Sequence, residues 1–73
     1  MIQIRFKEYY SKATKVVDNL PEFPRVIAYG EIFEVQKDRE DGQVLLKSRV
    51  GEEFLVPKDE YERLIMLSFA HHI

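Results

Sequence analysis

The sequence feature that most constrains the fold is a series of short β-like segments separated by turn residues in the middle of the chain. Residues 30–36 alternate apolar and polar side chains, as a half-buried strand does. Residues 38–42 are polar and end in Asp-Gly, a dipeptide typical of tight hairpins. In a strand over residues 44–48, Val44, Leu46 and Ser48 would share one face, and Gly51 separates this stretch from the largely apolar segment at residues 53–56. This pattern predicts an antiparallel meander.

The last hairpin of this meander also has a predicted register. A loop over residues 50–52 would place Leu46 beside Val56 and Arg49 beside Glu53. Apolar residues would then meet on one face of the sheet and opposite charges on the other, which stabilises antiparallel pairing.

The N-terminal segment alternates in the same way. Ile2, Ile4 and Phe6 are separated by polar residues, so a half-buried strand is expected from the start of the chain. Tyr9 and Tyr10 follow at its end.

Two stretches after this strand are less regular. Residues 11–19 contain Val16 and Val17, which suit either a short helix or a strand. Residues 20–24 contain two prolines, which remove backbone donors and favour an extended chain, so a loop is expected there.

A helix is predicted for the C-terminal segment. Pro57 ends the preceding strand, and Asp59 followed by Glu62 has the spacing of a capping box. The helix is expected from about Glu60 to the end of the chain. One arc of its surface would carry Tyr61, Leu64, Ile65, Ser68, Phe69 and His72.

Three stretches of the meander and the start of the predicted helix together form a pattern found in a known family. They are Gly-Glu-Ile-Phe-Glu-Val at residues 30–35, Asp-Gly-Gln-Val-Leu-Leu-Lys at 41–47 and Gly-Glu-Glu-Phe-Leu-Val-Pro-Lys-Asp-Glu-Tyr at 51–61. Together, over about residues 30–64, they resemble the small SH3-like β-barrel proteins encoded by bacteriophages and mobile elements. The resemblance implies an accessory or host-directed binding role, such as that of an inhibitor or regulator of a host protein.

Residues 1–73 are therefore expected to form one domain of the mainly β or α+β class. The expected architecture is a small curved antiparallel sheet, or an SH3-like barrel, of four to five strands with a C-terminal helix. The expected core consists of Ile4, Phe6, Val26, Phe33, Val35, Val44, Leu46, Phe54, Val56, Tyr61, Leu64, Ile65 and Phe69.

The size of the chain favours association with a partner. A chain of 73 residues buries only about 60% of its unfolded surface, and the absence of cysteine rules out disulfides. A protein partner, or self-association through the helix, is therefore expected. No apolar run is long enough to span a membrane, so we expect no membrane association and a cytoplasmic location.

Catalysis is not expected from these residues. There is no cysteine, and Ser11, Ser48 and Ser68 lie in no recognisable nucleophile motif. The only imidazoles, His71 and His72, are adjacent near the end of the chain and would point about 100° apart on a helix. We therefore expect no enzyme activity, no metal and no cofactor, and predict a protein-interaction module.

Two surfaces are candidates for the protein partner. The first is apolar: Met66 and Leu67 lie outside the core-facing arc of the predicted helix, and Ile73 follows them. They form either a binding seam or a cover for the edges of the sheet. The second is the acidic meander, which would complement a basic partner or would be an ordinary solvated face with interspersed cations. Its acidic residues are Glu31, Glu34, Asp38, Glu40 and Asp41.

The alternative partner is single-stranded nucleic acid. Residues 1–30 carry five basic and three acidic side chains, whereas residues 31–73 carry six and ten. Small β-barrels bind single strands by stacking bases on aromatic side chains beside a basic groove. The candidate residues are Arg5, Lys7, Tyr9, Tyr10, Lys12 and Lys15. In the competing interpretation, one of the tyrosines fills the core and the lysines are solvated.

Overall fold

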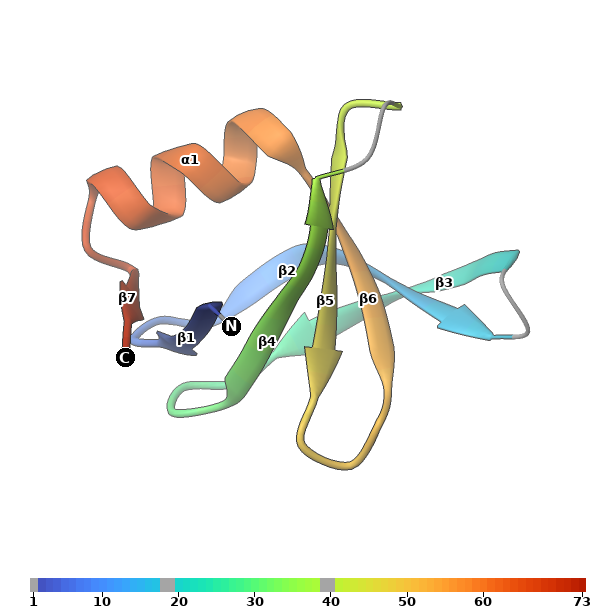
Figure 1. Cartoon of the computed structure of the whole chain (residues 1–73), viewed down its shortest axis with the longest axis horizontal. Coiled ribbons are helices and arrows are strands. Elements are labelled where there is room, and N and C mark those ends of the chain that lie inside the picture. Colours follow the sequence, from blue (N-terminus) through green and yellow to red (C-terminus); the bar gives the residue numbers. More distant parts are fainter. Residues whose placement is uncertain (1, 18–19, 39–40) are drawn as a thin grey trace.

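A computed structural model describes residues 2–17, 20–38 and 41–73 of the chain. Within these residues, seven strands form a single antiparallel sheet with one helix beside it (Figure 1). In chain order the elements are β1 (Ile2–Phe6), β2 (Tyr10–Val17), β3 (Leu20–Ile27), β4 (Ile32–Asp38), β5 (Gln43–Ser48), β6 (Glu53–Pro57), α1 (Lys58–Met66) and β7 (Ala70–His72).

The order of strands in the sheet is β3-β2-β6-β5-β4-β1-β7. The predicted meander is present as β4–β5–β6, and Figure 1 shows the β2–β3 hairpin extending across it. The class is mainly β with one helix near the C-terminus, as expected. The expected number of four to five strands was wrong, because the described residues form seven. Of the two expected arrangements, the open sheet is present and the closed barrel is not, because β3 and β7 are edges.

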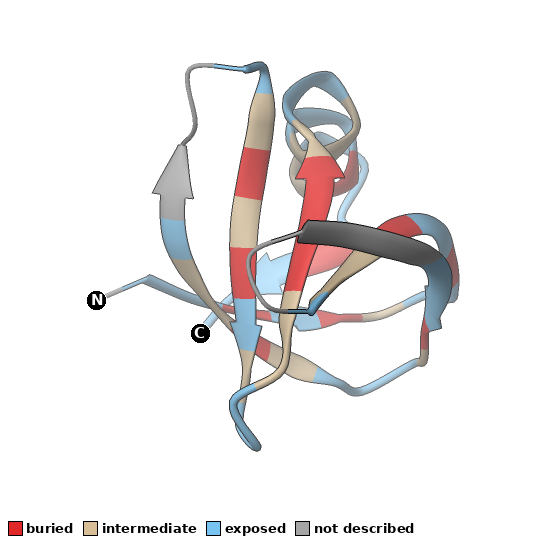
Figure 2. Ribbon diagram, turned by 90° about the vertical axis from the view of Figure 1, so that its right-hand side faces the viewer, coloured by how far each residue is buried: buried red, intermediate tan, exposed pale blue. Residues whose placement is uncertain are grey.

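The core lies on the inner face of the sheet, where buried positions recur along the strands (Figure 2). Phe33 is central to it, with Phe6 and Phe54 packed edge-on against its ring at centroid distances of 5.5 and 5.4 Å. The buried residues are Ile4, Phe6, Tyr10, Ala13, Ile27, Phe33, Val44, Leu46, Phe54, Leu55, Val56, Leu64 and Ala70. Val35, Tyr61 and Ile65 pack against this core while remaining partly exposed.

Two residues of the predicted core are instead exposed. The prediction placed the buried residue at Val26, one position too early, because Ile27 is the residue that pairs with Tyr10 and faces inward. Phe69 was wrong because it lies outside the helix, at the start of the return to the sheet, and Ala70 occupies the buried position next to it.

The N-terminal half contains more strand than its sequence indicated. Residues 11–17 belong to strand β2, and residues 20–24, expected to be a loop, are the first part of β3. Pro21 pairs with Val16 and Pro24 with Thr14. Proline is tolerated there because β3 is an edge strand.

The hairpin between β5 and β6 differs slightly from its predicted register. Leu46 pairs with Phe54 and Val44 with Val56. The loop is residues 49–51, one residue earlier than expected, and Gly51 closes it with a φ of 90°. The shift moves each pairing by two positions, so every side chain stays on its predicted face.

Helix α1 is shorter than predicted at its C-terminal end. It starts at Lys58, after Pro57, without a side-chain cap, so the expected capping box of Asp59 and Glu62 does not form. The helix ends in a Schellman arrangement: the Ser68 and Phe69 amides donate to the Ile65 and Leu64 carbonyls at 3.2 and 2.8 Å.

Ser68 takes the left-handed conformation that this motif requires, with a φ of 63°. Glycine normally occupies that position, and because a serine stands there the end of the helix was not predicted. The chain then reverses, and β7 pairs with β1, placing His72 opposite Ile4 and Ala70 opposite Phe6.

Candidate functional site

Helix α1 separates two surfaces of different character. Leu64 is its buried residue, and it attaches the helix to the core. On one flank the helix faces the β1–β2 connection and the start of β2, and on the other it faces β7. We call the first surface the Tyr10 pocket and the second the Met66 face.

The Tyr10 pocket is a hollow of about 290 Å³. Its lining includes Leu64 at the core side and aromatic rings at the rim. The N-terminal part of the chain contributes residues 8–12 to this lining, and the C-terminal part contributes Glu60, Arg63, Leu64 and Phe69.

The charges of the Tyr10 pocket form one connected group. The Lys12 Nζ lies 3.0 Å from the Glu60 Oε1, and the Arg63 Nε donates to the Glu60 Oε2 at 2.9 Å. The hydrogen bond from Lys12 and then that from Arg63 hold the pKa of the Glu60 carboxyl below its usual range. The carboxylate is thus held in place by a cation on each oxygen.

Tyr10 lies at the base of the pocket. Its side chain is 5% exposed, and its ring packs against that of Phe6 with centroids 6.2 Å apart. The hydroxyl is buried and has no hydrogen-bond partner among the residues that the structure describes. Burial, followed by the charge of Glu60, raises the pKa of Tyr10 to about 12. A neutral hydroxyl is therefore present at physiological pH, with its donor and acceptor capacity unused.

The Met66 face is a second hollow, of about 390 Å³, lined by Tyr61, Glu62, Ile65, Met66 and His72. Met66 is 77% exposed, whereas Tyr61 and Ile65 pack partly against the core. Because β1 alternates, Ile2 lies on the same sheet face as Ile4, the partner of His72, and it is also exposed. Apolar side chains thus dominate this flank.

The structure separates the three apolar residues that the sequence grouped together. Met66 lines the Met66 face, but Leu67, 46% exposed at the helix end, does not. Ile73 is exposed, and its amide donates to the Gln3 carbonyl, a register that places it on the opposite sheet face from His72. Met66, Leu67 and Ile73 therefore do not line one common hollow. Tyr61, Ile65 and His72 accompany Met66 instead.

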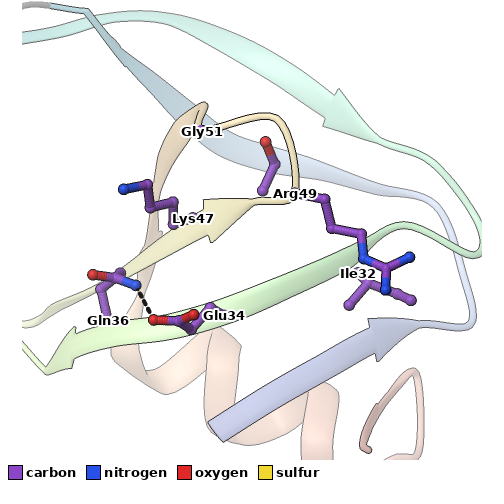
Figure 3. A pocket seen from close by; sticks show the side chains of 7 residues that line it. Ile32, Glu34, Gln36, Lys47, Arg49 and Gly51 are labelled. Atoms are coloured by element: carbon purple, nitrogen blue, oxygen red, sulfur yellow. Dashed lines mark hydrogen bonds between the residues drawn. The ribbon is translucent and has the colours of Figure 1, made fainter. Parts of the chain in front are cut away.

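The acidic residues of the meander are interrupted by other groups. Glu34 pairs across the sheet with Lys47 and accepts a hydrogen bond from the side-chain amide of Gln36 (Figure 3). Glu34, Gln36, Lys47 and Arg49 line a hollow of about 400 Å³ over β4 and β5.

The remaining acidic residues are dispersed. Glu31 accepts a hydrogen bond from the Ala28 amide, and Asp41 accepts one from the Gln43 amide. Glu40 and the side chain of Asp38 lie outside the described part of the structure. Among the described acidic residues of the meander, Glu34 shares a hollow with two cations, Lys47 and Arg49.

The basic residues proposed for nucleic-acid binding also lie in different surroundings. Arg5 lies on the outer face between Ile32 and His71. Lys15 binds Glu52 at 2.7 Å, and Arg25 binds the same carboxylate at 3.3 Å. Hydrogen bonding by Lys15 is the main cause that lowers the pKa of Glu52.

Only part of the nucleic-acid set comes together. Tyr9, Tyr10 and Lys12 line the Tyr10 pocket, whereas Arg5, Lys7 and Lys15 do not. Tyr10 was wrong as a stacking surface, because it is buried; Tyr9, 73% exposed, is available for that role.

Sequence reasoning did not assign six residues of the pocket to a site, namely Glu8, Ser11, Glu60, Arg63, Leu64 and Phe69. The spacing of Glu60 and Arg63 was a signal that they share a helix flank.

Among the described residues no group of three or more His, Cys, Asp or Glu side chains is placed to hold a metal ion. The one helix in the described part of the chain is too short and too polar to cross a membrane.

Comparison with protein-family models finds no match, and comparisons with curated proteins and with solved structures find no significant match.

Proposed function

We propose that the protein is a non-catalytic protein-interaction module and that its docking surface is the Met66 face. The observation that supports this most is the 77% exposure of Met66 beside the partly exposed Tyr61 and Ile65. Exposed apolar patches on small domains commonly mark interaction sites. Complete burial of a methionine side chain contributes about 1.5–3 kcal/mol.

The lining of the Met66 face indicates what the partner presents. Three apolar side chains would receive an apolar side chain of the partner, and Met66 adapts to varied shapes because its thioether chain is flexible and polarizable. Glu62 at the rim would meet a basic group next to that apolar residue. A protein surface with an apolar residue flanked by lysine or arginine is the expected occupant.

The resemblance of residues 30–64 to bacteriophage and mobile-element proteins adds a biological role to this proposal. An inhibitor or regulator acts by occupying a surface of a host protein, which requires a docking face and no catalytic centre. Residues outside the Met66 face, including those of the acidic meander, would then contribute at the edge of the interface.

A matched pair of variants tests the docking surface. Met66→Glu places a charge in the hollow, whereas Leu67→Glu places the same charge one residue later, outside it. Affinity-tagged wild type and both variants are compared by capture of proteins from cells and by light scattering of the purified chains. A partner, or a second copy of the chain, that binds the wild type and Leu67→Glu but not Met66→Glu is expected.

Circular dichroism first establishes that both variants are folded. Equal binding by Met66→Glu and the wild type would refute this docking surface, as would loss of binding by both variants alike. A wild type that is monomeric and captures nothing that depends on Met66 would refute the proposal as a whole.

A further inference from the structure

The outer face of strands β4 and β5 carries charged side chains that docking at the Met66 face does not use. Phe33 and Leu46 are buried in the core, so the side chains next to them along each strand, including Glu34 and Lys47, point to the other side of the sheet. Glu34 and Lys47 are cross-strand neighbours there. Lys47 is exposed and Glu34 is partly exposed, so a ligand can reach this face.

Two adjoining hollows form a groove on this side of the sheet. Their volumes are about 400 and 270 Å³, and Ile32, Ser48 and Arg49 line both of them. We call the combined surface the Arg49 groove. Figure 3 shows the Arg49 guanidinium beside Ile32 at one end of the first hollow and Lys47 toward the other end.

The carboxylates that line the Arg49 groove already have partners within the chain. Glu34 in the first hollow and Glu31 in the second each accept a hydrogen bond from an amide of the chain. Glu52, also in the second hollow, binds two cations at 2.7 and 3.3 Å. These acidic groups therefore do not need a cation from a ligand.

The cations of the groove have no such partners. Lys47 and Arg49 are exposed, and neither side chain forms an ion pair or a hydrogen bond with a described residue. By contrast, four cations elsewhere in the described part of the chain each bind a glutamate. Arg5, the cross-strand neighbour of Ile32, adds a third unpaired cation to the same face. The unused binding capacity of the groove is thus cationic and favours an anionic ligand.

The uncharged part of the groove distinguishes between anionic partners. Ile32 is partly exposed among these cations, and Val50 at the rim of the second hollow is 82% exposed. No aromatic side chain in the described part of the chain lines either hollow, whereas single-stranded nucleic acids bind by stacking their bases on such rings. Aliphatic surface beside unpaired cations suits a peptide that carries both aliphatic and acidic side chains.

From these observations we propose that the Arg49 groove binds an extended acidic segment of a partner protein, in which an aliphatic residue is flanked by aspartate or glutamate. The aliphatic side chain contacts Ile32, and the carboxylates bind Lys47 and Arg49. The guanidinium of arginine matches the geometry of a carboxylate with two parallel donors. The charge of this ligand is opposite to that expected at the Met66 face, so the protein would have two docking sites for different segments.

The test is a titration followed by the backbone amide NMR signals of residues 30–36 and 45–51. The probe is the blocked pentapeptide Glu-Asp-Leu-Asp-Glu. The comparison probes are Gln-Asn-Leu-Asn-Gln, which has no charge, Glu-Asp-Gly-Asp-Glu, which has no aliphatic side chain, and a short oligothymidylate. The acidic leucine peptide is expected to shift these signals at millimolar concentration, to bind about threefold or more tightly than the other two peptides, and to lose affinity as salt is added.

A matched pair of variants connects the binding to the groove. Arg49→Gln removes one positive charge from both hollows and is expected to weaken the acidic peptide about fivefold, the upper range for one exposed ion pair. Lys7→Gln removes the same charge from a residue that lines neither hollow, and it should leave the affinity within about twofold of the wild type. The amide spectra themselves show that both variants are folded.

Four results would overturn the proposal. They are the absence of shifts at millimolar acidic peptide, equal binding of either comparison peptide, equal weakening by Arg49→Gln and Lys7→Gln, and tighter binding of the oligothymidylate, which would assign the groove to nucleic acid. The Met66 face is tested separately. Met66→Glu should bind the acidic peptide like the wild type, and Arg49→Gln should retain any partner that depends on Met66, so either proposal can fail without the other.

Discussion

Helix α1 has one flank on which charges are paired internally and one on which apolar side chains are left to solvent. On the Tyr10 side, Glu60 is bound by Lys12 and Arg63 in a hollow that also contains the exposed Tyr9. On the Met66 side, the side chains that line the hollow form no such network among the described contacts, and Met66 is 77% exposed. The same nine-residue helix thus borders a charge-paired hollow on one side and a largely apolar one on the other.

This difference is one of rigidity. The polar flank holds its charged groups in ion pairs around a small hollow. The apolar flank carries an exposed and flexible thioether side chain. Leu64 supports both flanks, since it is the buried residue of the helix.

The largest expected effect comes from removing that support. Leu64→Ala should lower the free energy of unfolding by about 3 kcal/mol, within the range for a buried leucine whose loss leaves a cavity. Both flanks should lose their geometry together, and urea denaturation measures the loss. Leu67→Ala, at the exposed helix end, is the matched control and should cost less than half as much. Equal effects would mean that Leu64 does not carry the attachment of the helix.

Tyr10→Phe should act in the opposite direction on the polar flank. Since the hydroxyl is buried without a partner among the described residues, replacing it with hydrogen should raise the free energy of unfolding by about 1 kcal/mol at neutral pH. The ring packing against Phe6 is retained. A loss of stability in this variant would show that the hydroxyl is satisfied in solution.

The same variant should change the alkaline limit of stability. The folded-state pKa of Tyr10 is raised from 10.0 to about 12, so the neutral hydroxyl is favoured by folding. Its contribution is complete below pH 10 and is lost as the pH rises through about 12. The free energy of unfolding, measured by urea denaturation from pH 9 upward, should therefore fall more steeply for the wild type than for Tyr10→Phe. Parallel curves would contradict the burial of the hydroxyl.

Acidification should affect the polar flank to a smaller extent. The folded-state pKa of Glu60 lies below the ordinary value of 4.5, so its ion pairs stabilise the fold above that pH and are lost as the pH falls through the folded-state value. Glu60→Gln should flatten the stability profile in this acidic window. The control, Glu62→Gln, removes a carboxylate from the other side of the helix and should leave the profile steep. Equal flattening by both variants would remove the special role of Glu60.

The sequence was informative about the meander because its signals are local. Alternation and an Asp-Gly turn identified β4 to β6, and a two-position register error left every side chain on its predicted face. Residues 20–24 were misjudged because prolines exclude a central strand but not an edge strand, and edge position is a property of the whole sheet. The end of α1 was misjudged because Ser68 adopts a conformation usually given to glycine.

The candidate sites depended even more on long-range structure. Met66 was identified from helical periodicity, but its companion His72 reaches that flank only because the helix ends and β7 pairs with β1. Lys12 and Glu60 are far apart in the chain, and nothing local predicts their ion pair. Tyr9 and Tyr10 were both singled out, yet only the structure shows that one is exposed and the other buried.

The smallest expected effect distinguishes an exposed binding residue from a structural one. Met66→Gln keeps a similar length and helix propensity, and because Met66 is 77% exposed the free energy of unfolding should change by less than about 0.5 kcal/mol. Ile65→Gln, one residue earlier and partly packed on the core, should cost distinctly more in the same urea titration. If the free energy of unfolding changes little in Met66→Gln and much in Ile65→Gln, the Met66 side chain does not serve folding. If Met66→Gln instead destabilises as much as Ile65→Gln, Met66 belongs to the packing of the helix, and the contrast between the charge-paired flank and the exposed apolar flank no longer holds.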